Sequence, residues 1–340
     1  GKETKEPKTD KVTFTREAKI NLVTKDITYG EWTAKNNDTT FDAVTSPVVK
    51  GYILKSNQDS QGNLVSTDGT SVVASGNLTE ASENQNVNVV YTKLGSWVLT
   101  PPTGVTPPEG SNFGPKPYPN HPTDPTKPGD PTNPDTPNVP VIPYVPGYTP
   151  GIPTDPTKPV DPNTNPLVPL TPVDPNHPEN GYKVPEIPTT PGKDTPITYE
   201  ADPQKAVVKV VKVEEKDGVK TETPLEADKV SMNGKTGEEI PDESVTAKIA
   251  DLEKRGYIIE NKEDVLNFIK EKFDNKKDTD EENPSQNITL KVHEKVVEVT
   301  EPPTPNTPVD PNVPVEPDKP VDPTVPKWPS EGLKESDLKK

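Results

Sequence analysis

The sequence predicts an α+β protein in which two small folded modules are separated and followed by extended, proline-rich stalks. The first observation is the distribution of the 47 prolines: 30 lie between residues 101 and 196, and 11 between 302 and 329. The second is that apolar residues with strand or helix spacing concentrate in the other segments. We therefore expect modules at 1–100 and 197–301, a stalk at 101–196, and a stalk with a polar tail at 302–340.

Composition excludes several classes of function. Only 27% of the 340 residues are hydrophobic, and the net charge is −17. Nucleic acid and acidic membrane surfaces are poor partners for such a chain, because phosphate binding needs clustered Lys and Arg. No apolar run approaches the ~18 residues of a membrane span. Without cysteine there is no disulfide framework or thiolate metal site, and a disulfide-free extracellular protein is typical of a Gram-positive cell wall.

The first module, residues 1–100, is predicted to be β-rich. Val12 and Phe14 alternate with polar residues, the alternation continues from Ala18 to Leu22, and a second run follows at 27–32. Such alternation is typical of half-buried strands. Residues 87–91 predict another strand, and the segments 57–63 and 66–71 predict loops. A short helical turn at 46–52 is an open alternative.

The stalk prediction for 101–196 is based on the spacing of its prolines. Every third residue is proline from Pro119 to Pro146, and again from Pro305 to Pro329. A polyproline II helix has 3 residues per turn, so these prolines would line one of its edges. A flexible linker is the alternative, and an SH3-type ligand is a weaker one. Tyrosines with aliphatic neighbours interrupt the stalk and are interpreted as stacking on proline rings or as ligand surfaces: Tyr144, Tyr148 and Tyr182.

The second module, residues 197–301, is predicted to be α+β. Valines at 207–213 indicate a strand, and residues 244–255 show helical spacing. Asp242 or Ser244 is expected to cap this helix, and Gly256 suits its left-handed exit. Strands are expected at 257–259 and 288–292. One helix against a small mixed sheet is a β-grasp-like plan.

The search for catalytic chemistry finds no candidate. His121, His177 and His293 form no metal-spaced cluster, and no nucleophile elbow, phosphate loop or dinucleotide motif is present. We expect no enzyme activity, no catalytic residues, no cofactor and no metal. The acidic segment Asp274–Glu282 is interpreted as a solvated loop, with a calcium site as the alternative. A Lys–Asn isopeptide bond is a further open alternative, without assigned partners.

Three aromatic residues of the first module have two interpretations. Trp32, Tyr29 and Tyr52 are expected to form the core of a small domain that has few other large side chains. The alternative is an exposed platform on which a sugar ring stacks. The ligand-binding residues are therefore unknown from the sequence.

The segment 11–52 resembles the mucin-binding (MucBP/Mub-type) repeats of lactobacillar and streptococcal surface adhesins. Residues 87–97, 118–131 and 141–150 are similar to the linkers between those repeats. Residues 204–215, 228–240, 252–257 and 288–296 resemble the companion half of the repeat. Two departures stand out: the opening strand would precede Gly1, and 260–286 is a longer insertion than the family pattern implies.

The resemblance implies ubiquitin-like β-grasp folds and a place in long, wall-anchored adhesins that contact mucus glycoproteins. We therefore expect a monomeric segment of an extracellular adhesin that binds mucin or another host glycoprotein. The alternative is a structural spacer that presents a distal binding domain. Since the chain begins without methionine or a signal peptide, we interpret it as an internal fragment whose anchoring signal lies elsewhere.

Overall fold

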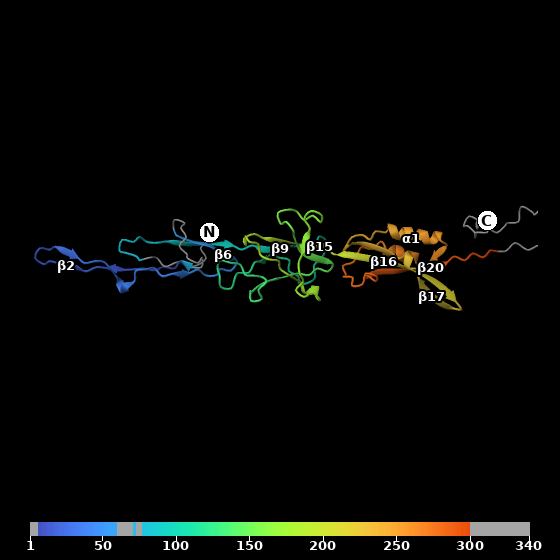
Figure 1. The fold of residues 1–340 in the computed structure, drawn as a ribbon, viewed down its shortest axis with the longest axis horizontal. Helices are drawn as coiled ribbons and strands as arrows, with labels where there is room; N and C mark the ends of the chain where they lie inside the picture. Colours follow the sequence, from blue (N-terminus) through green and yellow to red (C-terminus); the bar gives the residue numbers. More distant parts are fainter. Residues whose placement is uncertain (1–5, 60–70, 73–76, 300–340) are drawn as a thin grey trace, which may run out of the picture.

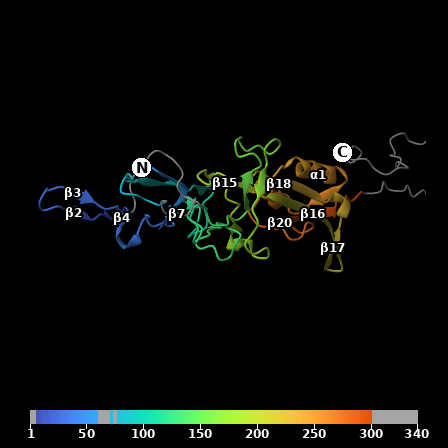
Figure 2. The same ribbon diagram turned by 60° about the vertical axis from the view of Figure 1, so that its left-hand side comes forward.

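The computed structural model describes residues 6–59, 71–72 and 77–299. Three folded parts follow one another along an elongated molecule (Figures 1 and 2). We refer to them as the N-terminal part (6–94), the central part (95–201) and the C-terminal part (203–299). Most regular structure in the described residues is β, with two α-helices in the C-terminal part. The expected stalk at 302–340 lies outside the described residues.

The N-terminal part consists of two-stranded antiparallel ribbons. The described strands pair as β1 with β4, β2 with β3, β5 with β7 and β6 with β8. A short 3-10 turn, η1 (Lys35–Asn37), follows β4. The strand bounds are β1 Phe14–Thr15, β2 Ala18–Ile20, β3 Ile27–Tyr29, β4 Thr33–Ala34, β5 Val44–Thr45, β6 Tyr52–Asp59, β7 Ser71–Val72 and β8 Val87–Lys93.

Strands of the N-terminal part form near the predicted places, but β6 extends into the predicted loop at 57–63, β7 begins at the end of the predicted loop at 66–71, and burial differs from the prediction. Strands form at 14–15, 18–20, 27–29 and 87–93, near the expected places, while the segment 46–52 contains no helix. The alternation predicted half-buried strands, yet Ile20 and Ile27 are about half exposed. Both lie on the β2–β3 ribbon, to which no other strand is paired, so neither face of the ribbon is covered by a sheet.

The central part corrects the stalk prediction. Residues 101–196 do not form a polyproline II rod; together with their flanks they build a five-stranded sheet in the order β10-β9-β15-β12-β13 and a small β11–β14 ribbon. The boundaries predicted near 100 and 196 fall at the end of one strand and within another. The bounds are β9 Ser96–Thr100, β10 Lys116–Pro117, β11 Val141–Ile142, β12 Tyr148–Pro153, β13 Leu167–Pro169, η2 Pro178–Asn180, β14 Tyr182–Lys183 and β15 Thr195–Ala201.

A buried aromatic and aliphatic core holds the central part together. Trp97 is fully buried, lies edge-to-face with Tyr118 at a centroid distance of 4.8 Å, and donates its indole N–H to the Pro185 carbonyl. The Tyr199 hydroxyl donates to the Pro143 carbonyl. Tyr182, expected to stack on proline rings or to bind a ligand, belongs to this core. The other buried members are Leu94, Leu99, Ile142, Val145, Leu170 and Ile197.

Asp–Pro–Thr and Asp–Pro–Asn units explain why the proline period gives folded loops. Proline has no N–H and fixes its own φ, which suits the second position of a turn. In each unit the Asp carboxylate accepts the N–H of the residue after the proline: Asp124 from Thr126, Asp130 from Thr132, Asp155 from Thr157, Asp161 from Asn163 and Asp174 from Asn176. The three threonines also donate their hydroxyls to the same oxygen. Each unit therefore bends the chain where a polyproline II helix would continue.

The C-terminal part is a mixed sheet covered by helices. The order is β17-β16-β20-β19, with β18 also paired to β16, and β16 is parallel to β20. The predicted strands at 207–213, 257–259 and 288–292 are confirmed, and the predicted helix is α1. The bounds are β16 Pro203–Lys216, β17 Val219–Pro224, η3 Glu226–Asp228, β18 Val230–Lys235, α1 Glu243–Lys254, β19 Tyr257–Ile259, α2 Lys262–Phe268 and β20 Gln286–Glu294.

Helix α1 begins and ends where the sequence indicates. Asp242 occupies the N-cap position, although its side chain makes no capping hydrogen bond, and Gly256 has a φ of 91°, the left-handed geometry that favours glycine. Arg255 holds the buried carboxylate of Asp228 with two bonds of 2.7 and 3.1 Å. This guanidinium, with Lys248 nearby, lowers the pKa of Asp228. The helix is thus tied to the turn that precedes β18.

The sequence did not predict β17, β18 or α2. Strand β17 is polar and fully exposed, so it carries no hydrophobic alternation. In β18 the alternation of Val230 and Met232 was an available signal, because both side chains are buried. The insertion at 260–286 contains α2, whose Val265 joins the core together with Ile269 and Phe273 beyond the helix.

Two networks of hydrogen bonds join the three parts without free linkers. Asn120 of the central part accepts the Gly51 N–H and donates to the Val49 and Tyr52 carbonyls. At the other junction, Asp202 accepts the Thr149 hydroxyl and donates its N–H to the Gly147 carbonyl, and its own carbonyl accepts the Thr236 N–H of the C-terminal part.

Glycine is required at this second junction. A Cβ on Gly147 would lie 2.7 Å from side-chain atoms of Thr236 and Asn275, both in the C-terminal part. With a φ of 79°, the residue also has a backbone conformation that side chains disfavour. The central and C-terminal parts therefore pack directly on each other.

Replacing Trp97 by alanine is expected to unfold or strongly destabilise the central part. Removal of a fully buried Trp costs about 3–5 kcal/mol. Denaturant unfolding measured by circular dichroism should show this loss. The matched change Trp32→Ala, at an exposed position, should cost less than about 1 kcal/mol; equal losses for the two variants would contradict the assigned core.

Acid is expected to destabilise the central part between about pH 4 and about pH 2. Hydrogen bonds from Thr157 lower the pKa of Asp155 to about 2, and bonds from Thr126, Thr132 and Asn163 lower the pKa values of their partner carboxylates. A depressed folded-state pKa stabilises the fold above the unfolded pKa of about 3.9, and this stability is lost as pH falls. Thermal unfolding at stepped pH measures it. Asp155→Asn, which cannot titrate, should flatten the profile; a profile that is flat for the parent protein would refute the role of these turns.

Candidate functional site

An arginine contacts two exposed aromatic rings in the N-terminal part. The guanidinium carbon of Arg16 is 3.8 Å from the centroid of the Tyr29 ring and 4.7 Å from that of Trp32. Both distances are within the ~6 Å of a cation–π interaction. We call these three residues the arginine–aromatic cluster. They belong to residues 14–34, which we call the finger, and which Figure 1 shows at one end of the molecule.

An irregularity in strand pairing brings the cluster together. Thr15 pairs with Thr33, and Ala18 pairs with Tyr29. Two residues on one side therefore face three on the other, which is the geometry of a β-bulge. In a regular strand, side chains three residues apart point to opposite faces. One extra residue shifts this alternation by one position, which agrees with the contact of both rings with Arg16.

The exposure of these aromatics corrects the expected core. Tyr29 is 55% exposed and Trp32 42%. Tyr52, expected beside them, is 39% exposed and lies in β6, where its carbonyl accepts a bond from Asn120 of the central part. The described core of the molecule instead lies in the central and C-terminal parts. The alternation of apolar and polar residues placed these aromatics in strands but predicted burial for them. The same alternation also occurs in a strand that is exposed on both faces.

The tip of the finger carries further exposed apolar side chains. The side chain of Asn21 shapes this turn by accepting the N–H groups of Val23 and Thr24. Leu22 is 75% exposed and Val23 is 90% exposed. Contiguous apolar groups on a surface mark an interaction site. The finger is also locally neutral, with equal numbers of basic and acidic residues, whereas the chain as a whole is strongly acidic.

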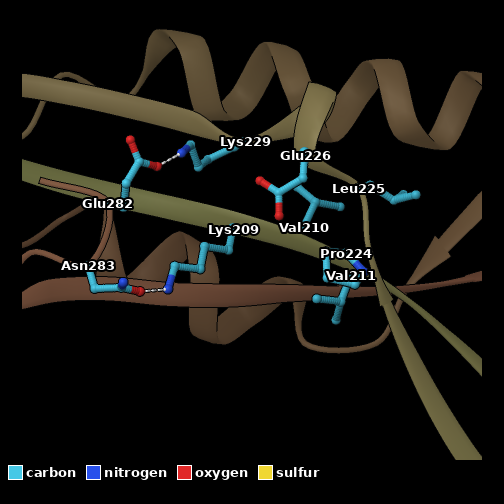
Figure 3. A pocket seen from close by; sticks show the side chains of 9 residues that line it. All are labelled: Lys209, Val210, Val211, Pro224, Leu225, Glu226, Lys229, Glu282 and Asn283. Atoms are coloured by element: carbon cyan, nitrogen blue, oxygen red, sulfur yellow. Dashed lines mark hydrogen bonds and ion pairs between the residues drawn. The ribbon is translucent and has the colours of Figure 1, made fainter.

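A shallow groove in the C-terminal part is the second candidate. Its volume is about 310 Å³, and its walls come from β16, the turn after β17 and the loop before β20 (Figure 3). Lys229 bonds to Glu282, which lowers the pKa of that carboxyl, and Lys209 bonds to Asn283. The lining combines two lysines and two glutamates with apolar and amide side chains: Lys209, Val210, Val211, Pro224, Leu225, Glu226, Lys229, Glu282 and Asn283.

The acidic segment and the histidines are placed in ordinary surface contacts. In Asp274–Glu282, Asp274 accepts the Ser285 hydroxyl and Asp280 accepts the Glu282 and Asn283 N–H groups. His177 and His293 each contact a glutamate, and His121 accepts backbone N–H groups. In the part of the chain that the structure describes, no three His, Asp or Glu side chains gather as a metal site.

Comparison with known protein families gives one match. The family model described as Muc B2-like domain matches residues 1–95. This segment covers the N-terminal part and includes the whole arginine–aromatic cluster. Comparison with curated proteins finds no match. Neither of the helices seen in the described residues has the length and hydropathy needed to cross a membrane.

Trp32 is expected to be open to solvent, unlike Trp97. Acrylamide should therefore quench a substantial fraction of the tryptophan fluorescence of the folded protein. In a Trp328→Phe background, which removes the third tryptophan of the sequence, the variant Trp32→Phe should lose much of that quenchable fraction and retain the emission of the buried Trp97. If Trp32→Phe leaves the quenching unchanged, Trp32 is not exposed to solvent and the description of the cluster is wrong.

Proposed function

We propose that this chain is a segment of an extracellular bacterial adhesin that binds mucin-type glycoproteins through its finger. The observation that carries the proposal is a coincidence of position. The family model for Muc B2-like domains matches residues 1–95, and the same residues hold the exposed arginine–aromatic cluster. The resemblance of 11–52 to mucin-binding repeats points to the same segment.

The cluster has the chemistry to bind an acidic sugar. Exposed Tyr and Trp rings offer a flat apolar face that matches the C–H face of a sugar ring, with a polar tip left for water. The Arg16 guanidinium presents five N–H donors in a planar fork that fits a carboxylate or sulfate. The site thus combines stacking with a charge partner, and an acidic sugar on a mucin glycan would use both.

The finger gains stability from a partner that covers it. An isolated two-stranded ribbon is only marginally stable in water, because neither face is packed. The aliphatic tip around Leu22 and Val23 would lose its contact with water in a complex. We propose that the tip contacts the glycoprotein chain while the cluster holds a glycan.

We further propose a β-grasp-like fold for the C-terminal part and a non-catalytic role for the whole segment. Support for the fold comes from the parallel pair β16–β20 at the centre of the sheet and from α1 between β18 and β19. The absence of cysteine and the resemblance to wall-anchored adhesins favour an extracellular, cell-wall-anchored protein that acts as a monomer. No cofactor or metal enters this proposal.

A structural spacer is the second candidate function. The observation that favours it is the bonding at both junctions, through Asn120 and Asp202, which joins the three parts into one elongated body. In this alternative the segment holds a distal binding domain away from the cell, and the finger has no ligand.

Binding to immobilised mucin by biolayer interferometry tests the adhesin function with the full chain. Arg16→Ala and Trp32→Ala should each weaken binding by about tenfold, the effect of removing a central aromatic or Arg anchor. Tyr52→Ala is the matched control, because Tyr52 is a similarly exposed aromatic outside the cluster. Circular dichroism of each variant confirms that the fold is retained.

The outcomes separate the two functions. Weaker binding of the cluster variants, with Tyr52→Ala unchanged, supports the finger as the binding site. Enzymatic removal of acidic sugars from the mucin should abolish the effect of Arg16→Ala if the arginine holds a charged sugar. No mucin binding by the folded parent protein would overturn the adhesin function for this segment and leave the spacer.

A further inference from the structure

The chain enters and leaves two successive parts of the molecule through neighbouring parallel strands. The central part is entered by β9 and left by β15, which pair in parallel from Trp97–Thr195 to Thr100–Thr198. The C-terminal part is entered by β16 and left by β20, which pair in parallel from Ala206–Gln286 to Lys212–Val292. In each part, therefore, tension applied to the chain ends acts on two paired parallel strands.

Tension along such a part shears the two strands against each other. Pulling on the chain ends draws the start of the entry strand and the end of the exit strand in opposite directions along the strand axis. All hydrogen bonds between the two strands are then loaded together, whereas a hairpin pulled from its open end breaks its bonds one at a time. Resistance to forced unfolding is set by the unfolding barrier. Loading many bonds at once raises the force needed to cross it.

The strands lie in the direction in which the molecule would be pulled. Figure 1 shows the β9–β15 pair and then the β16–β20 pair along the long axis, with the C-terminal end of the described chain leaving at one end. A single residue, Asp202, separates β15 from β16. Asp202 bonds to Thr149 and Gly147 of the central part, and its carbonyl accepts the Thr236 N–H of the C-terminal part. Because this one residue is bonded to both parts, force passes directly from one parallel pair to the next.

Burial protects both parallel pairs from water. Trp97 and Ile197 are fully buried on the β9–β15 pair, and Val208, Leu290 and Val292 are at most 1% exposed on the β16–β20 pair. Water that competes for the strand hydrogen bonds is thereby excluded, and breaking the pair exposes apolar surface at the same time. Strands β16 and β20 are paired over more residues than β9 and β15. We therefore expect the C-terminal part to need a higher unfolding force than the central part.

The finger lies outside this load path. Its base is closed by the Lys35 N–H, which donates to the Thr13 carbonyl, and by the Asp42 N–H, which donates to Asp10. The described ribbons of the N-terminal part are all antiparallel. This part therefore has no shear-loaded parallel pair among its described strands, and it is the weakest element in series.

We propose that the central and C-terminal parts form a force-bearing tether, in which the parallel pairs β9–β15 and β16–β20 act as two mechanical clamps in series. This function does not depend on the ligand of the finger. In this proposal the folded proline-rich segment carries tension. With increasing force, the N-terminal part unfolds first, the central part next and the C-terminal part last.

Single-molecule force spectroscopy on the full chain tests the ranking. Held by its two ends, the protein should show two late unfolding events, each releasing on the order of 300 Å of chain, as expected for unfolded segments of these lengths. The event of the C-terminal part should require the highest force. If the central or C-terminal part unfolds at a lower force than the N-terminal part, the proposal is overturned.

A change in pulling direction gives the matched control. The chain lacks cysteine, so paired cysteine handles can be introduced cleanly. Handles at Glu200→Cys and Lys295→Cys load the β16–β20 pair in shear, whereas handles at Glu200→Cys and Glu281→Cys pull at the same end of both strands and unzip them. The shear geometry should require a several-fold higher force. Equal forces in the two geometries would overturn the clamp.

Two further measurements complete the test. Leu290→Ala, beneath the clamp, should lower the shear force, and Val219→Ala, on the exposed strand β17, should leave it unchanged; the reverse result would contradict the load path. Intact mass is measured first, because a covalent Lys209–Asn283 bond would release one ammonia and carry the load itself. Such a loss would overturn a clamp made of hydrogen bonds.

Discussion

Every third residue over much of the central part has no backbone donor, and the structure depends on how that deficit is met. A helix cannot form where donors are missing at this period, and strands are limited to short segments such as β11 and β12. The aspartates placed before prolines solve the problem locally, since each carboxylate accepts the next free N–H and bends the chain. The bends return the chain to one place, where Trp97, Tyr118 and Tyr199 form a core and bond to the carbonyls of the proline-rich loops and their flanks.

This core determines the geometry of the rest of the molecule. By bringing 96–100 next to 195–201, it creates a parallel strand pair whose second strand runs into the C-terminal sheet. On the other side, Asn120 fixes the base of the N-terminal part. The proline-rich segment thus connects the binding finger to the C-terminal sheet, and it does so as a packed domain. Presentation of the finger and transmission of force follow from the same contacts.

The finger exposes side chains to a ligand, whereas the two sheets bury apolar side chains. A ribbon exposed on both faces keeps Tyr29, Trp32 and the aliphatic tip accessible, at the expense of packing. The two sheets bury a continuous set of apolar side chains on the β9–β15 and β16–β20 pairs. Because the finger lies at one end of the molecule, a ligand can be held there without contacting the parallel pairs.

The sequence alone determined the local features: strands in the N-terminal part, helix α1 with its exit at Gly256, and the alternating strand β20. These depend on periodicity and on single-residue conformational preferences, which act over a few residues. Only the tertiary structure decided burial. Tyr29 and Trp32 are exposed because no third strand covers their ribbon, while Tyr182 is buried because a strand pair formed across the proline-rich loops. The proline period predicted a polyproline II rod, and this prediction was wrong. Side-chain acceptors at a few aspartates and contacts nearly a hundred residues apart fold the segment instead.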